Sequence, residues 1–156
     1  MKLQKLISKL EKHHKKKLDL SLGRTFNLLK KLGDPQDKLK NVITVVGTNA
    51  KASMCYSFKS ILNQAGHKTN LYTSPHLLSY TERYVFDDKE INEEDLIELL
   101  TGVEKTLGDD NATLFEILTC AFLKYAENFK DNINIIEAGL FHQFDSTNVF
   151  KENLMT

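Results

Sequence analysis

Apolar residues near the start of the chain recur at every third or fourth position, which is the spacing that places them on one face of a helix. Two segments show this pattern, residues 2–16 and residues 22–32, and Gly33-Asp34-Pro35 then gives a helix stop signal. We therefore expect two amphipathic helices that dock through their apolar faces. The predicted inner residues are Leu3, Leu6, Ile7 and Leu10 in the first helix and Leu22, Phe26, Leu29 and Leu32 in the second.

Three short runs of β-branched and apolar residues predict strands, at residues 42–46, 69–73 and 133–137. Such runs are typical of strands that are buried on both faces of a parallel sheet. Between the first two runs, helical spacing continues up to Gly66, so we expect a right-handed βαβ unit. The predicted inner face of its helix consists of Met54, Phe58, Ile61, Leu62 and Ala65.

The remaining pattern predicts a small hairpin and two further helices. Tyr84-Val85-Phe86 and Lys89-Glu90-Ile91 flank a tight turn, Asn92 is a candidate N-cap for a helix that ends at Gly108, and Thr113 with Glu116 matches a capping box that opens a helix to about residue 129. We see no internal repeat and no interdomain linker. The expected fold class is α/β, with a three-layer P-loop NTPase-like parallel sheet flanked by helices.

Composition places the chain among soluble globular proteins of one-domain size, with 156 residues, of which 41% are hydrophobic and 27% charged. Cys55 and Cys120 lack the spacing of metal ligands, so we expect reduced, packed thiols. No run reaches membrane-spanning length, and the first 17 residues lack the apolar core of a secretory signal. A cytoplasmic protein is the simplest expectation.

The net charge of zero conceals a division between a basic beginning and an acidic remainder. Residues 1–40 carry 12 Lys and Arg against 4 Asp and Glu, and residues 41–156 carry 9 against 17. A basic arm can attract a nucleotide, an anionic substrate or nucleic acid, but a solvated helix end is the simpler interpretation. Nucleic acid is the least favoured partner, because no aromatic residues are interleaved with the lysines.

The strand at residues 42–46 leads into a loop of small residues and then into a helix, and these are the parts of a phosphate cradle. In such a cradle the amides at the helix start face an anion, a lysine contacts the phosphates and a hydroxyl helps to hold Mg²⁺. The loop departs from the usual G-x-x-x-x-G-K-[ST] pattern, so an ordinary βα turn with a surface lysine stays an alternative. The loop residues are Gly47, Thr48, Asn49, Ala50, Lys51, Ala52 and Ser53.

Two further polar positions are predicted at the same edge of the sheet. Glu137 ends the third strand, and Ser74 and His76 follow the second, where open α/β sheets bind ligands. An acid at that position can hold Mg²⁺ from the side opposite the loop. Taken alone, the acid is equally compatible with a solvated loop, and Ser-Pro-His is more often a plain turn, so it is their shared edge that favours a site.

Five ordered motifs in this chain resemble the folylpolyglutamate synthase/dihydrofolate synthase family, a group of Mur-ligase-type ATP-dependent amide ligases. The resemblance runs from about residue 18 to residue 149. Its Ser-Pro-His-Leu and Thr-x-Phe-Glu elements separate this family from other Mur ligases. The motifs are the phosphate loop, Thr73-Ser74-Pro75-His76-Leu77, Tyr80-Thr81-Glu82-Arg83, Thr113-Leu114-Phe115-Glu116, and Glu137-Ala138-Gly139-Leu140 with Asp145-Ser146-Thr147-Asn148.

The resemblance implies a ligase that adds L-glutamate to dihydropteroate or a folate through an acyl phosphate, with ATP and Mg²⁺ as cofactors. It also implies that Gly47 to Ser53 bind ATP, with Lys51 as the catalytic lysine, and that Ser53, Ser74 and Glu137 bind the metal. The partners would be small molecules only, without nucleic acid or membrane, and the protein a monomer. The pterin contacts implied are Leu18, Asp19, Leu20, Thr113, Leu114, Phe115 and Glu116.

The chain also departs from the family pattern. Ala50 and Ala52 replace two glycines of the phosphate loop, Ser21 and Gly23 replace a Gly and a Glu, and residues 139–145 lose an Arg and two glycines. We expect Ala50→Gly to change ATP affinity by less than about tenfold, on the assumption that the loop has settled into a conformation that alanine tolerates.

The expected domain content is residues 1–156 as the first portion of the ATP-binding domain, without the C-terminal glutamate-binding domain, and such a fragment alone would be inactive. Two alternatives stay open at this point. One is another Mur-type amide ligase, and the other is a nucleotide-binding module without ligase activity.

Overall fold

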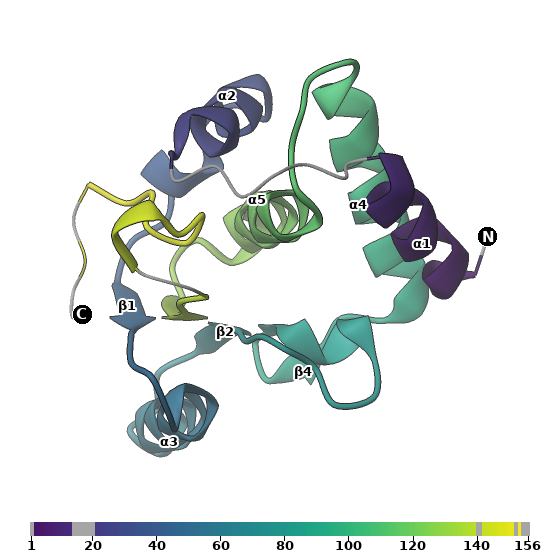
Figure 1. Ribbon diagram of the computed structural model, residues 1–156. Coiled ribbons are helices and arrows are strands. Elements are labelled where there is room, and N and C mark those ends of the chain that lie inside the picture. Colours follow the sequence, from purple (N-terminus) through teal and green to yellow (C-terminus); the bar gives the residue numbers. More distant parts are fainter. Residues whose placement is uncertain (1, 14–20, 140–141, 152, 154–156) are drawn as a thin grey trace.

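A mixed five-stranded sheet organises the computed structural model, which describes residues 2–13, 21–139, 142–151 and 153 (Figure 1). The strand order is β1-β5-β2-β3-β4. β1, β5 and β2 are parallel, whereas β3 and β4 add an antiparallel hairpin. The predicted α/β class, three parallel strands and hairpin are thus confirmed. The bounds are β1 Val42–Val45, β2 Thr69–Tyr72, β3 Tyr84–Phe86, β4 Lys89–Glu90 and β5 Ile133–Glu137.

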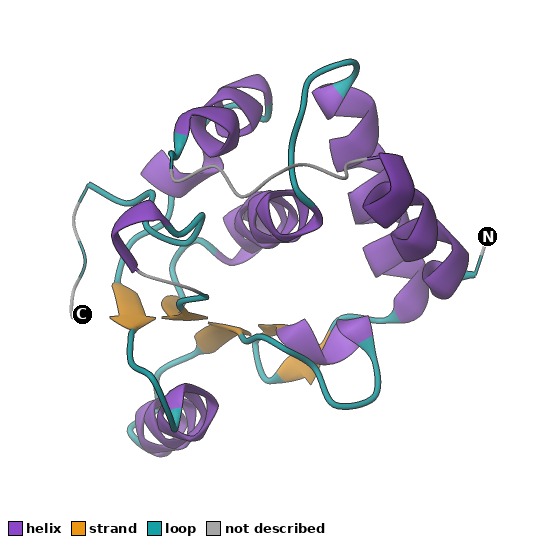
Figure 2. Ribbon diagram, viewed as in Figure 1, coloured by secondary structure: helices purple, strands orange, loops and turns teal. Residues whose placement is uncertain are grey.

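Helices cover both faces of this sheet, giving the predicted three layers (Figure 2). α3 lies alone on one face, and α5 runs across the other with α1, α2 and α4 around it. Of the first predicted helix, residues 14–16 lie outside the described residues. The α-helices are α1 Leu3–His13, α2 Gly23–Lys31, α3 Lys51–Gln64, α4 Glu93–Leu107 and α5 Leu114–Ala126, and the short 3₁₀ helices are η1 Pro35–Asp37, η2 Tyr80–Arg83, η3 Glu127–Phe129 and η4 His142–Phe144.

Two hydrophobic cores form because neighbouring residues of a strand point to opposite faces of the sheet. Tyr72 and Ile136 belong to the larger core under α5, whereas Leu71 and Ile135, one position earlier in each strand, belong to the smaller core under α3. Strands buried on both faces are therefore apolar at consecutive positions, as the sequence pattern predicted.

Several residues that we expected to be buried are exposed, among them Val46 just after β1 and Ala65 just after α3. Phe26 is 44% exposed, whereas Leu28 and the predicted Leu29 are fully buried, so the buried face of α2 is centred nearer to Leu28 than we expected. Met54 and Ile61 are 50% and 65% exposed. A single helix on an otherwise open sheet face buries only a narrow strip, which in α3 is centred on Cys55 with Phe58 and Leu62 beside it.

The predicted helix starts are confirmed in atomic detail. The Asn92 side chain accepts a hydrogen bond from the Asp95 amide at 2.8 Å. At the start of α5 both bonds of the capping box form: the Thr113 hydroxyl accepts from the Glu116 amide, and the Glu116 carboxylate accepts from the Thr113 amide. These caps are local features, so the sequence alone predicts them.

The insertion of β5 between β1 and β2 aligns the carboxyl ends of the three parallel strands. Val45 lies opposite Glu137, and Tyr72 lies opposite Ile136. The βαβ unit that we expected therefore spans a central strand that comes much later in the chain. As a result, the segments after β1, β2 and β5 all begin at one edge of the sheet.

A buried hydroxyl on the inner face of α2 provides a stability test. Thr25 is fully buried, and its hydroxyl is one of the buried polar atoms without a hydrogen-bond partner in the described part of the chain. We expect Thr25→Val to raise the free energy of unfolding by about 1 kcal/mol, because it removes a desolvated, unpaired group at constant shape. Chemical denaturation measures the change.

The matched control for this substitution is Thr119→Val in α5. The Thr119 hydroxyl is also buried, but it accepts from the Ser146 hydroxyl and lies 3.3 Å from the Tyr72 hydroxyl. Thr119→Val should lower the free energy of unfolding by about 1–2 kcal/mol, because the hydroxyls of Tyr72 and Ser146 would lose a hydrogen-bond partner. Destabilisation of similar size in both variants would contradict the distinction.

Candidate nucleotide and metal site

The loop between β1 and α3 lies open at the carboxyl edge of the sheet. Residues 46–50 are exposed, and α3 begins at Lys51. The Lys51 ammonium donates a hydrogen bond to the Gly47 carbonyl at 3.0 Å, which folds the side chain back over its own loop. Because the first helical hydrogen bond is donated by Met54, the amides of Lys51, Ala52 and Ser53 have no partner within the helix. Amides at a helix start form an anion site.

The backbone at Ala50 corrects one of our expectations. Ala50 has φ 61° and ψ 11°, which is the left-handed region. A Cβ in this region costs about 1–2 kcal/mol, so the assumption that the loop conformation suits alanine is wrong. Glycine suits this position because it adopts a positive φ without a Cβ clash, and this chain keeps the same conformation with alanine.

A pair of glycine substitutions tests the strain at Ala50. We expect Ala50→Gly to raise the free energy of unfolding by up to about 1 kcal/mol, since relief of the Cβ clash outweighs the added freedom of the unfolded chain. Ala52→Gly should instead lower it by about 0.5–1 kcal/mol, because Ala52 lies in the first turn of α3. Chemical denaturation of both variants gives the signs, and loss of stability in both would contradict the assigned strain.

Glu137 and Ser74 meet where β5 and β2 end. The Ser74 amide donates to Oε2 of Glu137 at 2.7 Å, and Glu137 as a whole residue is only 3% exposed. Burial raises the pKa of Glu137, while the Ser74 hydrogen bond and the charges of Lys51 and Arg83 oppose this rise. Within the described residues no cation forms an ion pair with this carboxylate. Glu137 is therefore largely removed from water, and the cations that stabilise its negative charge, Lys51 and Arg83, act without direct contact.

These residues fit a divalent cation held together with phosphates. Mg²⁺ typically takes one or two carboxylates, and completes its shell with water and phosphate oxygens. Glu137 supplies such a carboxylate, and a cation would neutralise its buried charge. Across the described ranges there is no group of three or more His, Cys, Asp or Glu that could hold a metal on its own, so this donor set suits a metal that arrives with a nucleotide.

A cluster of His76, Tyr80 and Arg83 adjoins this pair. Arg83 donates from Nε to Nδ1 of His76 at 2.9 Å, its guanidinium lies 4.9 Å from the Tyr80 ring centre, and the His76 and Tyr80 rings are 4.1 Å apart. Burial and the Arg83 charge lower the pKa of His76. Sequence reasoning assigned no role to Arg83. The signal that could have found it is an arginine one residue before a predicted strand, beside the Ser-Pro-His turn.

The segment of residues 113–116 borders the same edge. Gly139, two residues after Glu137, has no room for a side chain: a Cβ there would lie 3.0 Å from the Phe115 ring and 2.5 Å from Oδ2 of Asp145. Glu116, however, is occupied by the chain itself, with one carboxylate oxygen accepting from Arg24 and the other from the Thr113 amide. Glu116 is thus placed to position this segment. The predicted contacts Leu18, Asp19 and Leu20 lie outside the described residues.

Both cysteines are buried and reduced, as predicted. Burial, with the nearby Glu137 charge, raises the pKa of Cys55 to about 12. Burial likewise raises the pKa of Cys120. Neither thiol forms a thiolate near neutral pH, which excludes both as nucleophiles.

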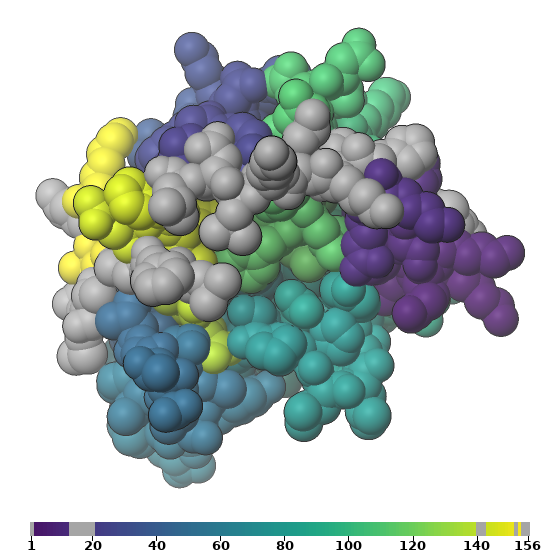
Figure 3. Space-filling view, in the orientation of Figure 1, coloured from purple at the N-terminus to yellow at the C-terminus, as the bar shows by residue number. Residues whose placement is uncertain are grey.

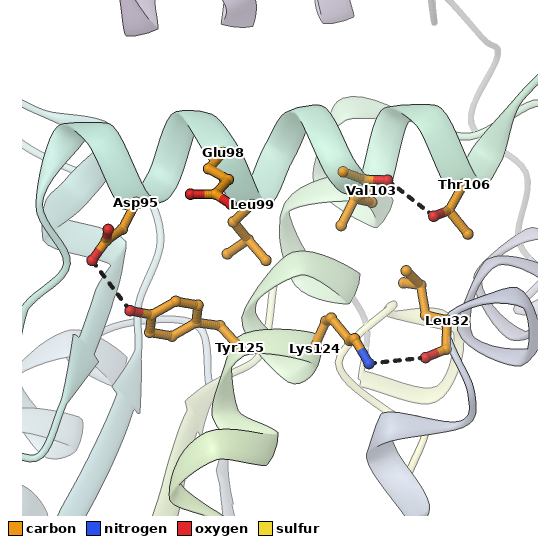
Figure 4. Close-up of a pocket in the computed structure, with 9 residues that line it drawn as sticks. Leu32, Asp95, Glu98, Leu99, Val103, Thr106, Lys124 and Tyr125 are labelled. Carbon is orange, nitrogen blue, oxygen red and sulfur yellow. Dashed lines mark hydrogen bonds between the residues drawn. The ribbon is translucent and has the colours of Figure 1, made fainter.

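A hollow of about 480 Å³ lies between α4 and α5 (Figure 4). Its polar groups bind one another: the Tyr125 hydroxyl donates to Asp95, and the Lys124 ammonium donates to the Leu32 carbonyl. Lys124 lies about two helical turns beyond Glu116 along α5. This hollow is thus separate from the strand ends.

In the space-filling view, α3 and the loop before it form an exposed face of the molecule (Figure 3).

The chain resembles curated relatives over most of its length but spans only about a third of theirs. It is 36% identical over 143 residues to the dihydrofolate synthase/folylpolyglutamate synthase of Escherichia coli, covering 92% of this chain and 34% of the relative. It is also 36% identical over 142 residues to the Bacillus subtilis protein of the same name, covering 86% and 33%. No family model matches the chain.

Solved structures agree with the sequence comparison. The structure of Escherichia coli FolC in complex with DHPP and ADP aligns with a TM-score of 0.89 at 35% identity, covering 96% of this chain and 36% of that one. The Yersinia pestis bifunctional folylpolyglutamate synthase/dihydrofolate synthase complexed with AMPPNP and Mn aligns with a TM-score of 0.91 at 31% identity, covering 99% and 38%.

Within the described residues, no helix has both the length and the apolar character needed to cross a membrane. Sequence, fold and the alignment of the strand ends lead to one assignment. The chain belongs to the dihydrofolate synthase/folylpolyglutamate synthase family, with the sequence and fold of about a third of the length of its curated members.

Proposed function

We propose that this chain forms the nucleotide- and metal-binding part of an ATP-dependent ligase that adds L-glutamate to dihydropteroate or a folate through an acyl phosphate. The observation that carries the proposal is the hydrogen bond between Ser74 and the buried Glu137, at the sheet edge that also bears Lys51. In support, the Escherichia coli relative is solved with DHPP and ADP, and the Yersinia pestis relative with AMPPNP and Mn.

In this proposal each residue has a role set by its position. The amides at the start of α3 and the Lys51 ammonium bind the ATP phosphates, since both present positive charge to an anion. Gly47, Thr48, Asn49 and Ala50 form the loop around them. Ser53, Ser74 and Glu137 hold Mg²⁺, which when bound neutralises charge on the transferring phosphoryl group.

The chain's contribution to the chemistry is positioning and charge neutralisation. ATP transfers its γ-phosphoryl group to the acceptor carboxylate, ADP leaves, and the glutamate amine then displaces phosphate from the acyl phosphate. Leu114 and Phe115, with Thr113 and Glu116 setting the start of α5, are proposed to face the acceptor, because Phe115 packs beside Gly139 just beyond Glu137. Leu18, Asp19 and Leu20 are proposed as further acceptor contacts.

The domain content also stays a proposal. We infer that residues 1–156 are a portion of the ATP-binding domain and that glutamate is bound by a separate C-terminal domain outside this chain. On that basis the isolated chain should bind nucleotide but not turn over. A cytoplasmic monomer stays our expectation.

Joining residues 1–151 to the rest of the Escherichia coli relative tests the proposed activity. With dihydropteroate, L-glutamate and ATP, the chimera should release ADP only when all three are present, and the unaltered relative serves as the positive control. Calorimetry on the 156-residue chain should separately show binding of Mg·AMPPNP. Nucleotide binding without any acceptor-dependent ADP release would favour the nucleotide-binding module, and turnover with a different acyl acceptor would favour another Mur-type ligase.

A further inference from the structure

Arg83 is held in one orientation by three contacts. Its Nε donates to His76, its guanidinium lies over the Tyr80 ring, and its backbone carbonyl accepts from the Thr73 amide at 3.3 Å. A guanidinium has five N–H donors in a fixed fork. Among the described residues no carboxylate forms an ion pair with Arg83, and the contact to His76 is its one side-chain hydrogen bond. The terminal nitrogens therefore remain available while the side chain is already ordered.

Two neighbouring carboxylates are already engaged by backbone amides. Glu82 accepts from the amides of Leu77, Leu78 and Ser79, and Glu137 accepts from the Ser74 amide. Glu11 lies near the Tyr80 ring and interacts with its hydroxyl. Within the described residues, Arg83 therefore carries a positive charge without an ion-pair partner at a partly buried position. A partly desolvated cation of this kind favours an incoming anion, and the planar fork matches a carboxylate.

The place of Arg83 in the sheet indicates which anion it faces. Arg83 immediately precedes β3, whose Tyr84 pairs with Tyr72 of β2, so Arg83 lies beside the segment leading to Ser74. Its charge also lowers the pKa of Glu137 against the effect of burial. In the order β1-β5-β2-β3, the phosphate loop follows β1 on one side of Glu137, and Arg83 stands on the other side. Lys51 and the amides at the start of α3 already supply positive charge for the phosphates, so Arg83 is left to bind a different anion.

We propose that Arg83 binds the reacting carboxylate of the acyl acceptor, and that His76 is a positioning residue that orients the guanidinium through its Nδ1. This inference rests on the proposed function and adds the group that recognises the acceptor's charge. The pairing keeps a carboxylate next to Glu137 and the metal position, where the γ-phosphoryl group would arrive. It also screens the repulsion between two carboxylates at one site.

Two ligands that differ only in charge test the proposal: dihydropteroate and its carboxamide. Calorimetry on the chain with Mg·AMPPNP present should show that the wild type binds the acid at least about tenfold more tightly than the amide, and that Arg83→Gln removes this preference while leaving amide binding unchanged. Arg83→Lys should retain part of the preference, because it keeps the charge without the fork. Lys68→Gln, which removes an exposed lysine paired with Asp87, is the matched control and should behave as the wild type.

Each other result has a definite meaning. An unchanged acid-to-amide ratio in Arg83→Gln overturns the role of Arg83 while the proposed function stands. Weakened AMPPNP binding in Arg83→Gln with an unchanged ratio assigns Arg83 to the nucleotide instead and likewise overturns the inference. If the wild type binds AMPPNP but not the acid, the proposed acceptor fails, and the inference fails with it. For His76, ¹⁵N spectra should show an unprotonated Nδ1 that Arg83→Gln perturbs, and an unperturbed signal contradicts the positioning role.

Discussion

Replacing Lys51 with alanine should weaken the binding of Mg·ATP by about a hundredfold and leave the free energy of unfolding within about 0.5 kcal/mol of the wild type. Charge-assisted hydrogen bonds to phosphate contribute about 1.5–3 kcal/mol, and about 1.4 kcal/mol corresponds to a factor of ten. In the ligand-free chain the ammonium donates to the carbonyl of Gly47 in its own loop and has no other hydrogen bond to a described residue, and alanine is favoured in the first turn of a helix. Calorimetry and chemical denaturation measure the two quantities.

Lys59→Ala is the matched control for this substitution. Lys59 lies in the same helix and pairs with Asp88 in the hairpin turn, away from the start of α3. Its loss should leave nucleotide affinity unchanged. Unaltered affinity in Lys51→Ala, or unfolding of that variant, would show that Lys51 is an ordinary surface or structural lysine.

Glu137→Gln should change binding and stability in opposite directions. The substitution removes the charge expected to hold the metal, so Mg²⁺-dependent nucleotide affinity should fall by about tenfold or more. The ligand-free chain should become more stable at pH 7, because glutamine keeps an acceptor for the Ser74 amide without the buried charge. Calorimetry with Mg²⁺ and denaturation without it separate the two effects.

The stability gain should depend on pH in a definite sense. Because burial raises the pKa of Glu137, the folded chain binds a proton more readily than the unfolded chain, and the ionised carboxylate destabilises the fold above both pKa values. The advantage of Glu137→Gln is therefore full above the folded pKa of Glu137 and disappears as the pH falls below the unfolded pKa of glutamate. A gain that grows on acidification, or a loss of stability at pH 7, would contradict the assigned burial cost.

Local chemistry accounts for what the sequence could predict of the fold. Strand runs such as residues 133–137 and caps such as Asn92 and Thr113 depend on neighbours in the chain, and each lies where expected. The place of β5 between β1 and β2 depends on long-range pairing that no local pattern encodes. The exposure of Met54 and Ile61 was missed because apolar spacing predicts which face of a helix is buried, but not how much of that face the neighbouring elements cover.

The candidate site divides in the same way. The strand ends predicted that Ser74 and Glu137 lie near each other, because parallel strands share one carboxyl edge. Their direct hydrogen bond could be seen only in the structure. The positive φ at Ala50 could not be predicted, since alanine is rarely chosen for that conformation. Glu116 was expected both to cap α5 and to contact the pterin. The cap is confirmed, and the carboxylate accepts hydrogen bonds from Arg24 and from the Thr113 amide.

The central claim is that the segments around Lys51, Ser74 and Glu137 form one site for a triphosphate and its divalent ion. Paramagnetic broadening of amide resonances by Mn·AMPPNP tests it most directly in this 17.9 kDa chain. We predict that the amides of residues 47–53, Ser74 and residues 137–139 broaden first and together, while those of α4 and β4 stay sharp. Broadening that omits Ser74 and Glu137, or that is centred on the hollow between α4 and α5, would contradict the account.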